Sequence, residues 1–159
     1  MLATLDRAGR RVIRLLIVDD HVAVRQGLQQ MFATVSGVEV VGVAVDGCEA
    51  VSQTNQFRPD VVLMDLEMPN LDGVEATRRI TTTHPTSRVV ILTASHDQSR
   101  IQDALRAGAV SYVPKHSDPD QVVRAVQDAG LEETRPTLAT SPARENRPQG
   151  LDYSTSGCS

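Results

Sequence analysis

Positive charge is scarce in this sequence of 159 residues. It has 16 lysine and arginine residues against 20 aspartate and glutamate residues, a net charge of −4 and a pI of about 5.5. A chain with this balance has no overall basic field to hold a phosphate backbone. We therefore expect no DNA binding from this chain alone.

Cysteines and long apolar runs are also scarce. The two cysteines, Cys48 and Cys158, lie far apart and lack the spacing of metal ligands, so both are predicted to be free thiols in a reducing compartment. No apolar run approaches transmembrane length, and residues 1–14 have no apolar stretch like that of a secretory signal. These absences predict a cytoplasmic protein without membrane association.

The segment 61–73, VVLMDLEMPNLDG, contains the most informative residue. An apolar run leads directly into Asp65 and then breaks at Pro69 and at Asp72-Gly73. Asp65 is therefore predicted where a buried strand ends in a loop, because a carboxylate in the middle of such a strand would be costly to bury. At the end of a strand, the carboxylate can meet a metal ion or a substrate.

Five mostly apolar segments alternate with five segments of helical period. The predicted strands cover residues 12–18, 38–44, 61–64, 89–93 and 110–113. The predicted helices begin at His21, Asp46-Gly47 and Asp72, before Ile101, and at Asp118-Pro119. Strict alternation with strands apolar on both sides predicts an α/β fold, a parallel sheet covered by helices on both faces.

Five polar residues stand where predicted strands end: Asp19, Asp20, Asp65, Thr93 and Lys115. Taken singly, each also fits a helix cap or a solvated loop. In a parallel sheet, however, all strand ends of this kind lie along one edge, where ligands bind. Lys115 is also the only lysine in the chain, which favours a site that needs a compact point charge.

Three carboxylates at one edge predict a metal site. At a separation of about 4 Å they would repel by roughly 4 kcal/mol per pair at an effective dielectric of 20, and a hard cation would relieve this repulsion. Oxygen ligands with open positions favour Mg²⁺. A metal ion, an amine and a hydroxyl around one carboxylate suit a transferred phosphoryl group, with Asp65 as the nucleophile.

The motifs LLIVDDH, VVLMDLEMPNLDG, VVILTAS and AGAVSYVPK, in this order, closely resemble the receiver domain of bacterial two-component response regulators over residues 12–128. The ending SYVPKHSDPDQVVRAV is most similar to the NarL/LuxR-type branch. The resemblance implies a flavodoxin-like, doubly wound sheet of five parallel strands in the order 2-1-3-4-5, with five helices. It also implies a phosphorelay switch that slowly dephosphorylates itself and is not a turnover enzyme.

The resemblance assigns a role to each site residue. Asp65 would accept phosphate from the phosphohistidine of a sensor histidine kinase. Asp19 and Asp20 would hold Mg²⁺ together with Asp65 and the backbone carbonyl of Glu67. Thr93 and Lys115 would bind the phosphoryl oxygens. Thr93 and Tyr112 would form the conformational switch, which changes the surface of the fourth helix, fifth strand and fifth helix, where partners or a second receiver in a homodimer bind.

The sequence departs from the family pattern at two places. His116 follows the lysine where many receivers have a proline in a cis bond, and a non-proline cis bond costs roughly 3 kcal/mol, so we expect a different loop. NarL/LuxR-type members usually carry a helix-turn-helix output domain, whereas residues from 131 onward have three prolines and no helical period. The predicted organisation is a flexible leader (1–11), a receiver domain (12–129) and a disordered tail (130–159), with no second folded domain.

Two alternatives to a receiver that acts through protein partners stay open. The chain could be a truncated NarL/LuxR-type DNA-binding transcription regulator that has lost its output domain. A more remote alternative is a Mg²⁺-dependent phosphohydrolase, although the segment Asp65-Leu66-Glu67 does not match the D-x-D signature of that class.

Overall fold

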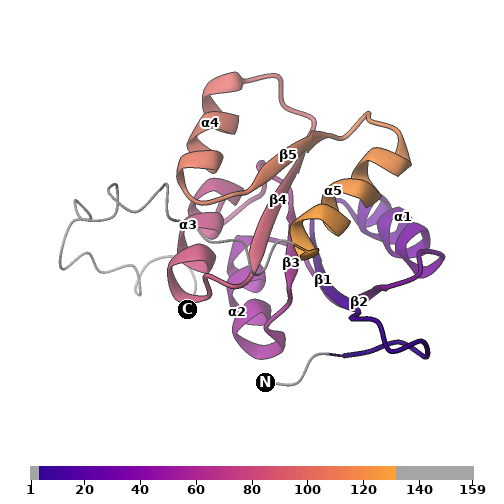
Figure 1. The fold of residues 1–159 in the computed structure, drawn as a ribbon. Coiled ribbons are helices and arrows are strands. Elements are labelled where there is room, and N and C mark those ends of the chain that lie inside the picture. Colours follow the sequence, from indigo (N-terminus) through magenta and orange to yellow (C-terminus); the bar gives the residue numbers. More distant parts are fainter. Residues whose placement is uncertain (1–3, 132–159) are drawn as a thin grey trace.

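The computed structural model describes residues 4–131, in which five strands alternate with five helices (Figure 1). The strands are β1 (Ile13–Val18), β2 (Val38–Ala44), β3 (Val61–Met64), β4 (Arg88–Thr93) and β5 (Ser111–Pro114). The helices are α1 (Val22–Ala33), α2 (Gly47–Phe57), α3 (Gly73–Thr83), α4 (Gln98–Arg106) and α5 (Pro119–Leu131). Every predicted element is present.

The five strands form one parallel sheet in the order β2-β1-β3-β4-β5, which confirms the predicted fold. The chain moves outward from β1 to β2 and then returns past β1 to β3. The loops that follow β1 and β3 therefore lie side by side at the carboxyl edge, at the point where the winding reverses.

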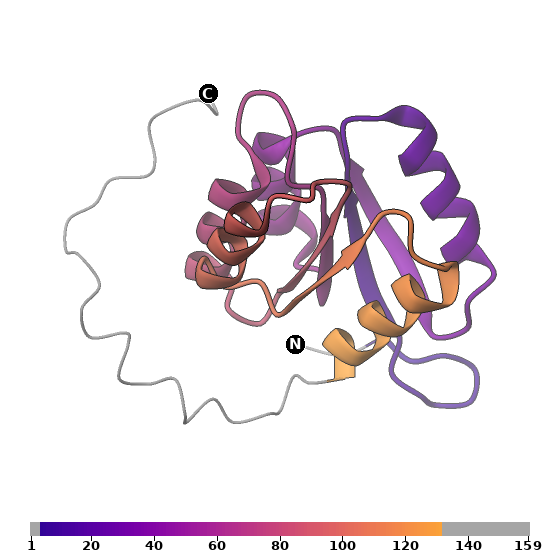
Figure 2. The same cartoon turned by 90° about the horizontal axis from the view of Figure 1, so that it is seen from above.

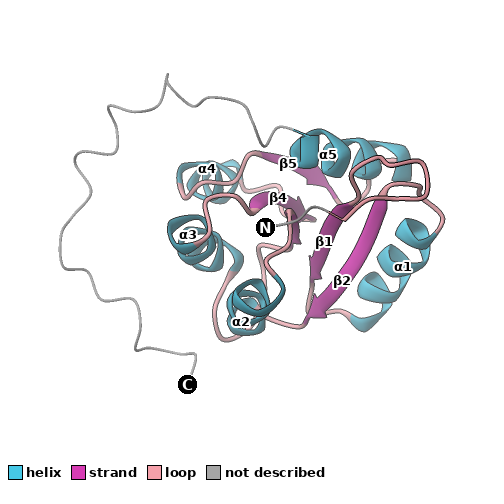
Figure 3. Ribbon diagram, turned by 60° about the horizontal axis from the view of Figure 1, so that its bottom comes forward, coloured by secondary structure: helices cyan, strands magenta, loops and turns pink. Residues whose placement is uncertain are grey.

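Helices cover both faces of the sheet. α1 and α5 lie on one side, and α2, α3 and α4 lie on the other (Figures 2 and 3). Consecutive strand residues point to opposite faces, so Leu15 packs in the same buried cluster as Phe32 of α1, while Leu16 packs with Ile80 of α3. Burial on both faces explains why the strand sequences are almost continuously apolar.

Aspartates begin three of the helices that position the site. The N-cap side chains of α2, α3 and α4 accept hydrogen bonds from backbone amides in the first turn; these caps are Asp46, Asp72 and Asp97. The prediction that Asp72 caps a helix is thus confirmed. Gly108, which follows α4, has a φ of +122°, a region that favours glycine.

The segment 4–11 is more regular than predicted. The Val12 amide donates to the Thr4 carbonyl over 2.7 Å, and the Asp6 carboxylate accepts hydrogen bonds from two backbone amides within the turn. Residues 4–11 thus form a hydrogen-bonded turn, in which Asp6 satisfies the backbone locally. The flexibility predicted for residues 1–11 stays a prediction.

The carboxyl-terminal end of the domain also differs from the prediction. α5 continues to Leu131, past the predicted limit at residue 129. Gly130 within it is buried against Ile13, so the helix still contacts the sheet beyond that limit. Residues 132–159, which include nearly all of the predicted tail, lie outside the described residues. The loop at His116 contains no cis bond, nor does the rest of the described chain.

Cys48 of α2 is disulfide-bonded, so the prediction of a free thiol at this position is wrong. Distance along the sequence is a weak argument against a disulfide, because the entropy of loop closure grows slowly with loop length. Cys158 lies outside the described residues. Within residues 4–131, no helix has the length and apolar character needed to cross a membrane.

Two glycines are expected to respond oppositely to substitution by alanine. A Cβ at Gly27, on the exposed side of α1, would have no neighbour within 4 Å, whereas one at Gly47 would lie 2.2 Å from the Leu71 carbonyl oxygen. Gly27→Ala should raise the free energy of unfolding by about 0.5–1 kcal/mol, because alanine loses less backbone entropy. Gly47→Ala should lower it by more than about 1 kcal/mol.

Urea unfolding of the two variants beside the parent protein measures both changes. A neutral or destabilising Gly27→Ala would contradict the placement of Gly27 on a solvent-facing side of α1.

Candidate functional site

Neighbouring strand ends bring the predicted site residues to one edge of the sheet. Asp19 follows β1, Asp65 follows β3, Thr93 ends β4 and Lys115 follows β5. The ladder continues just past the strands, since the Asp65 amide donates to the Val18 carbonyl over 3.0 Å and the Lys115 amide donates to the Thr93 carbonyl over 2.9 Å. These backbone hydrogen bonds thereby fix the Cα positions of Asp65 and Lys115.

Lys115 bridges two buried carboxylates. Its Nζ lies 2.6 Å from Asp19 Oδ2 and 3.4 Å from Asp65 Oδ2. The side chains of Asp19 and Asp65 are only 1% and 4% exposed, so water screens these charges poorly. Burial alone would lower the pKa of Lys115, but its hydrogen bond to Asp19 and the negative charges of Asp65 and Asp19 raise this pKa overall.

Asp65 is an unusually basic carboxylate. Burial, followed by the negative charge of Asp19, raises the pKa of Asp65 from 3.8 to about 6, against the smaller opposing effect of Lys115. The group is therefore mainly ionised at neutral pH yet held in an unfavourable environment. A cation or a bond formed at its oxygen would relieve this cost.

Asp20 and His21 complete an acidic cluster with Asp19 and Asp65. His21 Nδ1 lies 3.2 Å from Asp19 Oδ1 and 3.1 Å from Asp20 Oδ1. Each of these four residues offers one potential ligand atom, and the four atoms all lie within 4.8 Å of one another. This spacing could hold a metal ion. The carboxylate oxygens suit Mg²⁺.

The position of Asp19 depends on residues around it that the sequence did not single out. The Arg25 guanidinium of α1 donates to the Asp19 carbonyl over 2.8 Å, and the His21 amide donates to Asp19 Oδ1 over 2.9 Å. Neither His21 nor Arg25 was among the predicted site residues. Arg25 is one of 15 arginines in the chain, so no sequence signal distinguishes it.

The loop of the predicted acceptor Asp65 (residues 65–72, the acceptor loop) is packed tightly against the first residues of α2 and α3. Gly73 N donates to the Leu66 carbonyl over 3.0 Å, and a Cβ at Gly73 would lie 2.2 Å from the Asp65 carbonyl oxygen. Gly47 makes a similar close approach to Leu71. Glycine is required at both positions, because the loop backbone leaves no room for a Cβ. The sequence alone did not reveal this close approach.

Residues 66 and 67 of the acceptor loop make hydrogen bonds with α4 and with the Asp65 carboxylate. The Glu67 amide donates to Asp65 Oδ1 over 3.3 Å, which places Glu67 at the site through its backbone. Arg100 Nη2 of α4 donates to the Leu66 carbonyl over 3.2 Å. The sequence predicted a role for Glu67 but gave no signal for Arg100, since contacts between helices and loops depend on the fold.

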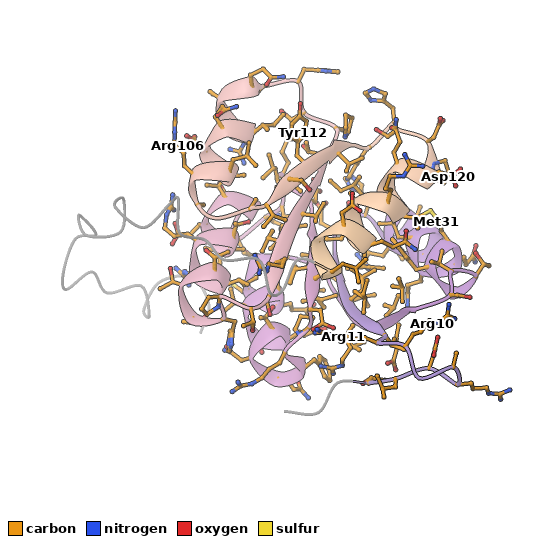
Figure 4. The ribbon with its side chains drawn as sticks, viewed as in Figure 1. Arg10, Arg11, Met31, Arg106, Tyr112 and Asp120 are labelled. Atoms are coloured by element: carbon orange, nitrogen blue, oxygen red, sulfur yellow. The ribbon has the colours of Figure 1, made fainter. Side chains whose placement is uncertain are left out.

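Thr93 and Tyr112 stand on the neighbouring strands β4 and β5. The buried Thr93 hydroxyl accepts a hydrogen bond from the Ser95 amide over 3.0 Å. Tyr112 is 39% exposed and lies on β5 near α4 (Figure 4). A pocket of about 80 Å³ between the β4–α4 loop and β5 is lined by both residues and by Ile101, among others.

The raised pKa of Asp65 predicts a pH-dependent stability. Between pH 3.8 and about 6 the folded chain holds the Asp65 proton more tightly than the unfolded chain, so this group makes stability fall as pH rises through that window. Without Mg²⁺, Asp65→Asn should therefore be more stable than the parent at pH 7, on the order of 1–3 kcal/mol, with little difference at pH 4.

Unfolding by urea in the presence of a chelator, at intervals from pH 4 to pH 8, measures this difference. Asp103→Asn, which removes an exposed carboxylate from α4, is the matched control and should show no such trend. An Asp65→Asn variant that is less stable than the parent at every pH would contradict the described electrostatics.

Comparison with known families agrees with this geometry. Residues 15–127 match the family described as the response regulator receiver domain. Over 116 residues the chain is 40% identical to the response regulator GacA of Pseudomonas viridiflava; the match covers 73% of this chain and 54% of that protein. The chain spans about half the length of the curated relatives it matches.

Solved structures show the same fold. A two-component response regulator of the LuxR family from Aurantimonas sp. SI85-9A1 superposes with a TM-score of 0.73 and 34% identity, covering 84% of this chain and 97% of that one. The CheX-CheY-BeF3-Mg²⁺ complex from Borrelia burgdorferi gives a TM-score of 0.70 and 28% identity, covering 78% and 93%. The chain belongs to the response regulator receiver domain family of two-component systems.

Proposed function

We propose that this chain is the phosphoacceptor of a two-component phosphorelay and that Asp65 receives the phosphoryl group from a sensor histidine kinase. The observation that carries the proposal is the placement of Lys115 between two buried carboxylates at the strand edge. An Asp65 oxygen attacks phosphorus, the bond from phosphorus to the kinase histidine breaks, and an acyl phosphate forms on Asp65. Lys115 then balances charge on the phosphoryl oxygens.

The acidic cluster supports a magnesium site. Receiver domains bind Mg²⁺ at an aspartate cluster, and here Asp19, Asp20 and Asp65 are the proposed carboxylate ligands, with the Glu67 backbone carbonyl as a fourth. When bound, the ion neutralises negative charge on the phosphoryl group. The raised pKa of Asp65 fits this assignment, because a nearby cation would favour its ionised, nucleophilic form.

We further propose that Thr93 and Tyr112 transmit phosphorylation to the surface of α4, β5 and α5. Thr93 would exchange its hydrogen bond with the Ser95 amide for one with the phosphoryl group, and Tyr112 would turn toward the pocket that both residues line. A hollow beside Tyr112, lined also by Val110 and Ala129, offers this surface to a protein partner or to a second copy of the chain. This is a population shift driven by contacts that only the phosphorylated state makes.

We propose a switch rather than an enzyme as the wider role of the protein. The family is one of phosphoacceptor switches, so we expect slow self-dephosphorylation rather than turnover. A phosphohydrolase is disfavoured, since Glu67 contacts Asp65 through its backbone amide and its side chain is exposed. The cytoplasm is the proposed location. Because Cys48 is disulfide-bonded, free thiols at both cysteines no longer support this location.

Transcription regulation is the second candidate function. The relatives include a transcriptional regulatory protein of Bacillus subtilis, LiaR, at 36% identity over 124 residues. We propose that any such control by this chain acts through protein contacts of the receiver domain, with no DNA binding by the chain alone. Measured DNA binding by the purified chain would contradict this proposal, and it would also count against a regulator that has lost its output domain.

Trifluoroberyllate with Mg²⁺ should bind at Asp65 and stabilise the protein. The ligand binds only the folded state, so the melting temperature of the parent should rise by several degrees in its presence. Asp65→Asn should show no rise, and Lys115→Met a reduced one, because the ammonium group is lost from the phosphoryl position. Asp103→Asn should respond as the parent does. Equal responses of the parent and Asp65→Asn in differential scanning fluorimetry would contradict the proposed acceptor.

Thr93→Ala should separate phosphoryl binding from the switch. The variant retains Asp65, Lys115 and the acidic cluster and loses one hydrogen bond, so trifluoroberyllate should still bind, within about tenfold of the parent affinity. The amide shifts that the ligand causes in β5 should decrease strongly in nitrogen-15 NMR spectra. Thr83→Ala, which removes a hydroxyl from the exposed end of α3, is the control. Full β5 shifts in Thr93→Ala would argue against a switch through Thr93.

A further inference from the structure

A long side chain from α4 reaches both ends of the acceptor loop. Arg100 Nη2 donates to the Leu66 carbonyl over 3.2 Å and lies 3.6 Å from Asp72 Oδ2. Leu66 directly follows the proposed acceptor Asp65, and Asp72 caps α3. One guanidinium thus connects α4 with the loop that carries the proposed phosphoryl site.

The contact with Leu66 also connects Arg100 to the Asp65 carboxylate. The Leu66 carbonyl and the Glu67 amide belong to the same planar peptide group. Asp65 Oδ1 accepts a hydrogen bond from the amide of this group over 3.3 Å, while Arg100 binds its carbonyl. A change of charge or bonding at Asp65 must therefore act on the same rigid unit that Arg100 holds.

Arg100 is not fully satisfied in this arrangement. Its side chain is 33% exposed, but its Nε is buried and has no hydrogen-bond partner among residues 4–131. An unpaired buried donor costs free energy, so a movement of the loop or of α4 that pairs this Nε recovers the cost. Arg100 can therefore favour a second arrangement of the acceptor loop and α4, in which its Nε is paired.

We propose that Arg100 is a positioning residue that couples occupancy of the Asp65 site to the placement of α4. The inference rests on the proposed function, because it requires Mg²⁺ and a phosphoryl group at Asp65. Arg100 fixes the peptide that leads into Glu67, the proposed carbonyl ligand, and so prepares the acceptor loop for the metal ion. Coupling is reciprocal, so the same contact that favours Mg²⁺ transmits Mg²⁺ and phosphoryl binding to α4.

Arg106 provides a matched control within the same helix. Its side chain is 76% exposed and its ion pair, 3.6 Å to Asp103, lies within α4 (Figure 4). Arg106→Ala therefore removes an arginine from α4 without touching the acceptor loop. Arg100→Lys is the conservative variant, since an ammonium group keeps the charge but lacks the planar fork that can face a carbonyl and a carboxylate together.

The test measures Mg²⁺ affinity and the amide shifts that Mg²⁺ with trifluoroberyllate causes in α4, using nitrogen-15 NMR on the full chain. Relative to the parent, Arg100→Ala should bind Mg²⁺ about fivefold more weakly and lose at least about half of the α4 shift. Arg106→Ala should match the parent, and Arg100→Lys should fall between Arg100→Ala and the parent.

Equal Mg²⁺ affinity and equal α4 shifts in Arg100→Ala and Arg106→Ala would overturn the coupling while leaving the proposed function intact. Absence of any Mg²⁺ or trifluoroberyllate response in the parent would overturn both. If the spectrum of Arg100→Ala shows an unfolded chain, the comparison of Arg100→Lys with Arg106→Ala decides the question by the same two readouts.

Discussion

Two carboxylates buried side by side, with one lysine between them, form the constraint on which the rest of this structure depends. Burial and the charge of Asp19 raise the pKa of Asp65 to about 6, and Lys115 offsets only part of that cost. Such a group persists only where surrounding structure over-determines its position. Here the apolar strands, covered on both faces, hold the three chain segments at one edge of the sheet.

The same constraint supports the proposed switch. An acceptor that is strained when empty gains most when a cation and a phosphoryl group bind, and that gain is available to shift neighbouring elements. The Gly73 amide and the Arg100 guanidinium both donate to the Leu66 carbonyl of the acceptor loop, so the loop has little freedom to absorb such a change alone. In the proposed mechanism the change is passed to α4 and β5, where Tyr112 lies exposed.

Much of the fold followed from the sequence because period and apolar runs are local signals. The strand that ends at Asp65, the cap at Asp72 and the parallel alternation were all predicted, and the strand order followed from the family resemblance. The strand-end residues were predicted because parallel strands share one edge. The structure brings four of these five residues, Asp19, Asp20, Asp65 and Lys115, together at that edge, and Thr93 ends the neighbouring strand β4.

Other features depend on contacts between distant segments, which a sequence pattern does not encode. Arg25 and Arg100 are ordinary helix arginines until the fold places them against the Asp19 and Leu66 carbonyls. The disulfide at Cys48 was also missed, because no spacing pattern in the sequence indicated it. The most direct test of the account is to locate the phosphoryl group by mass spectrometry after treatment of the chain with acetyl phosphate and Mg²⁺. The account predicts one phosphoryl group, on the peptide that contains Asp65; an unmodified chain, or modification at another residue, would contradict it.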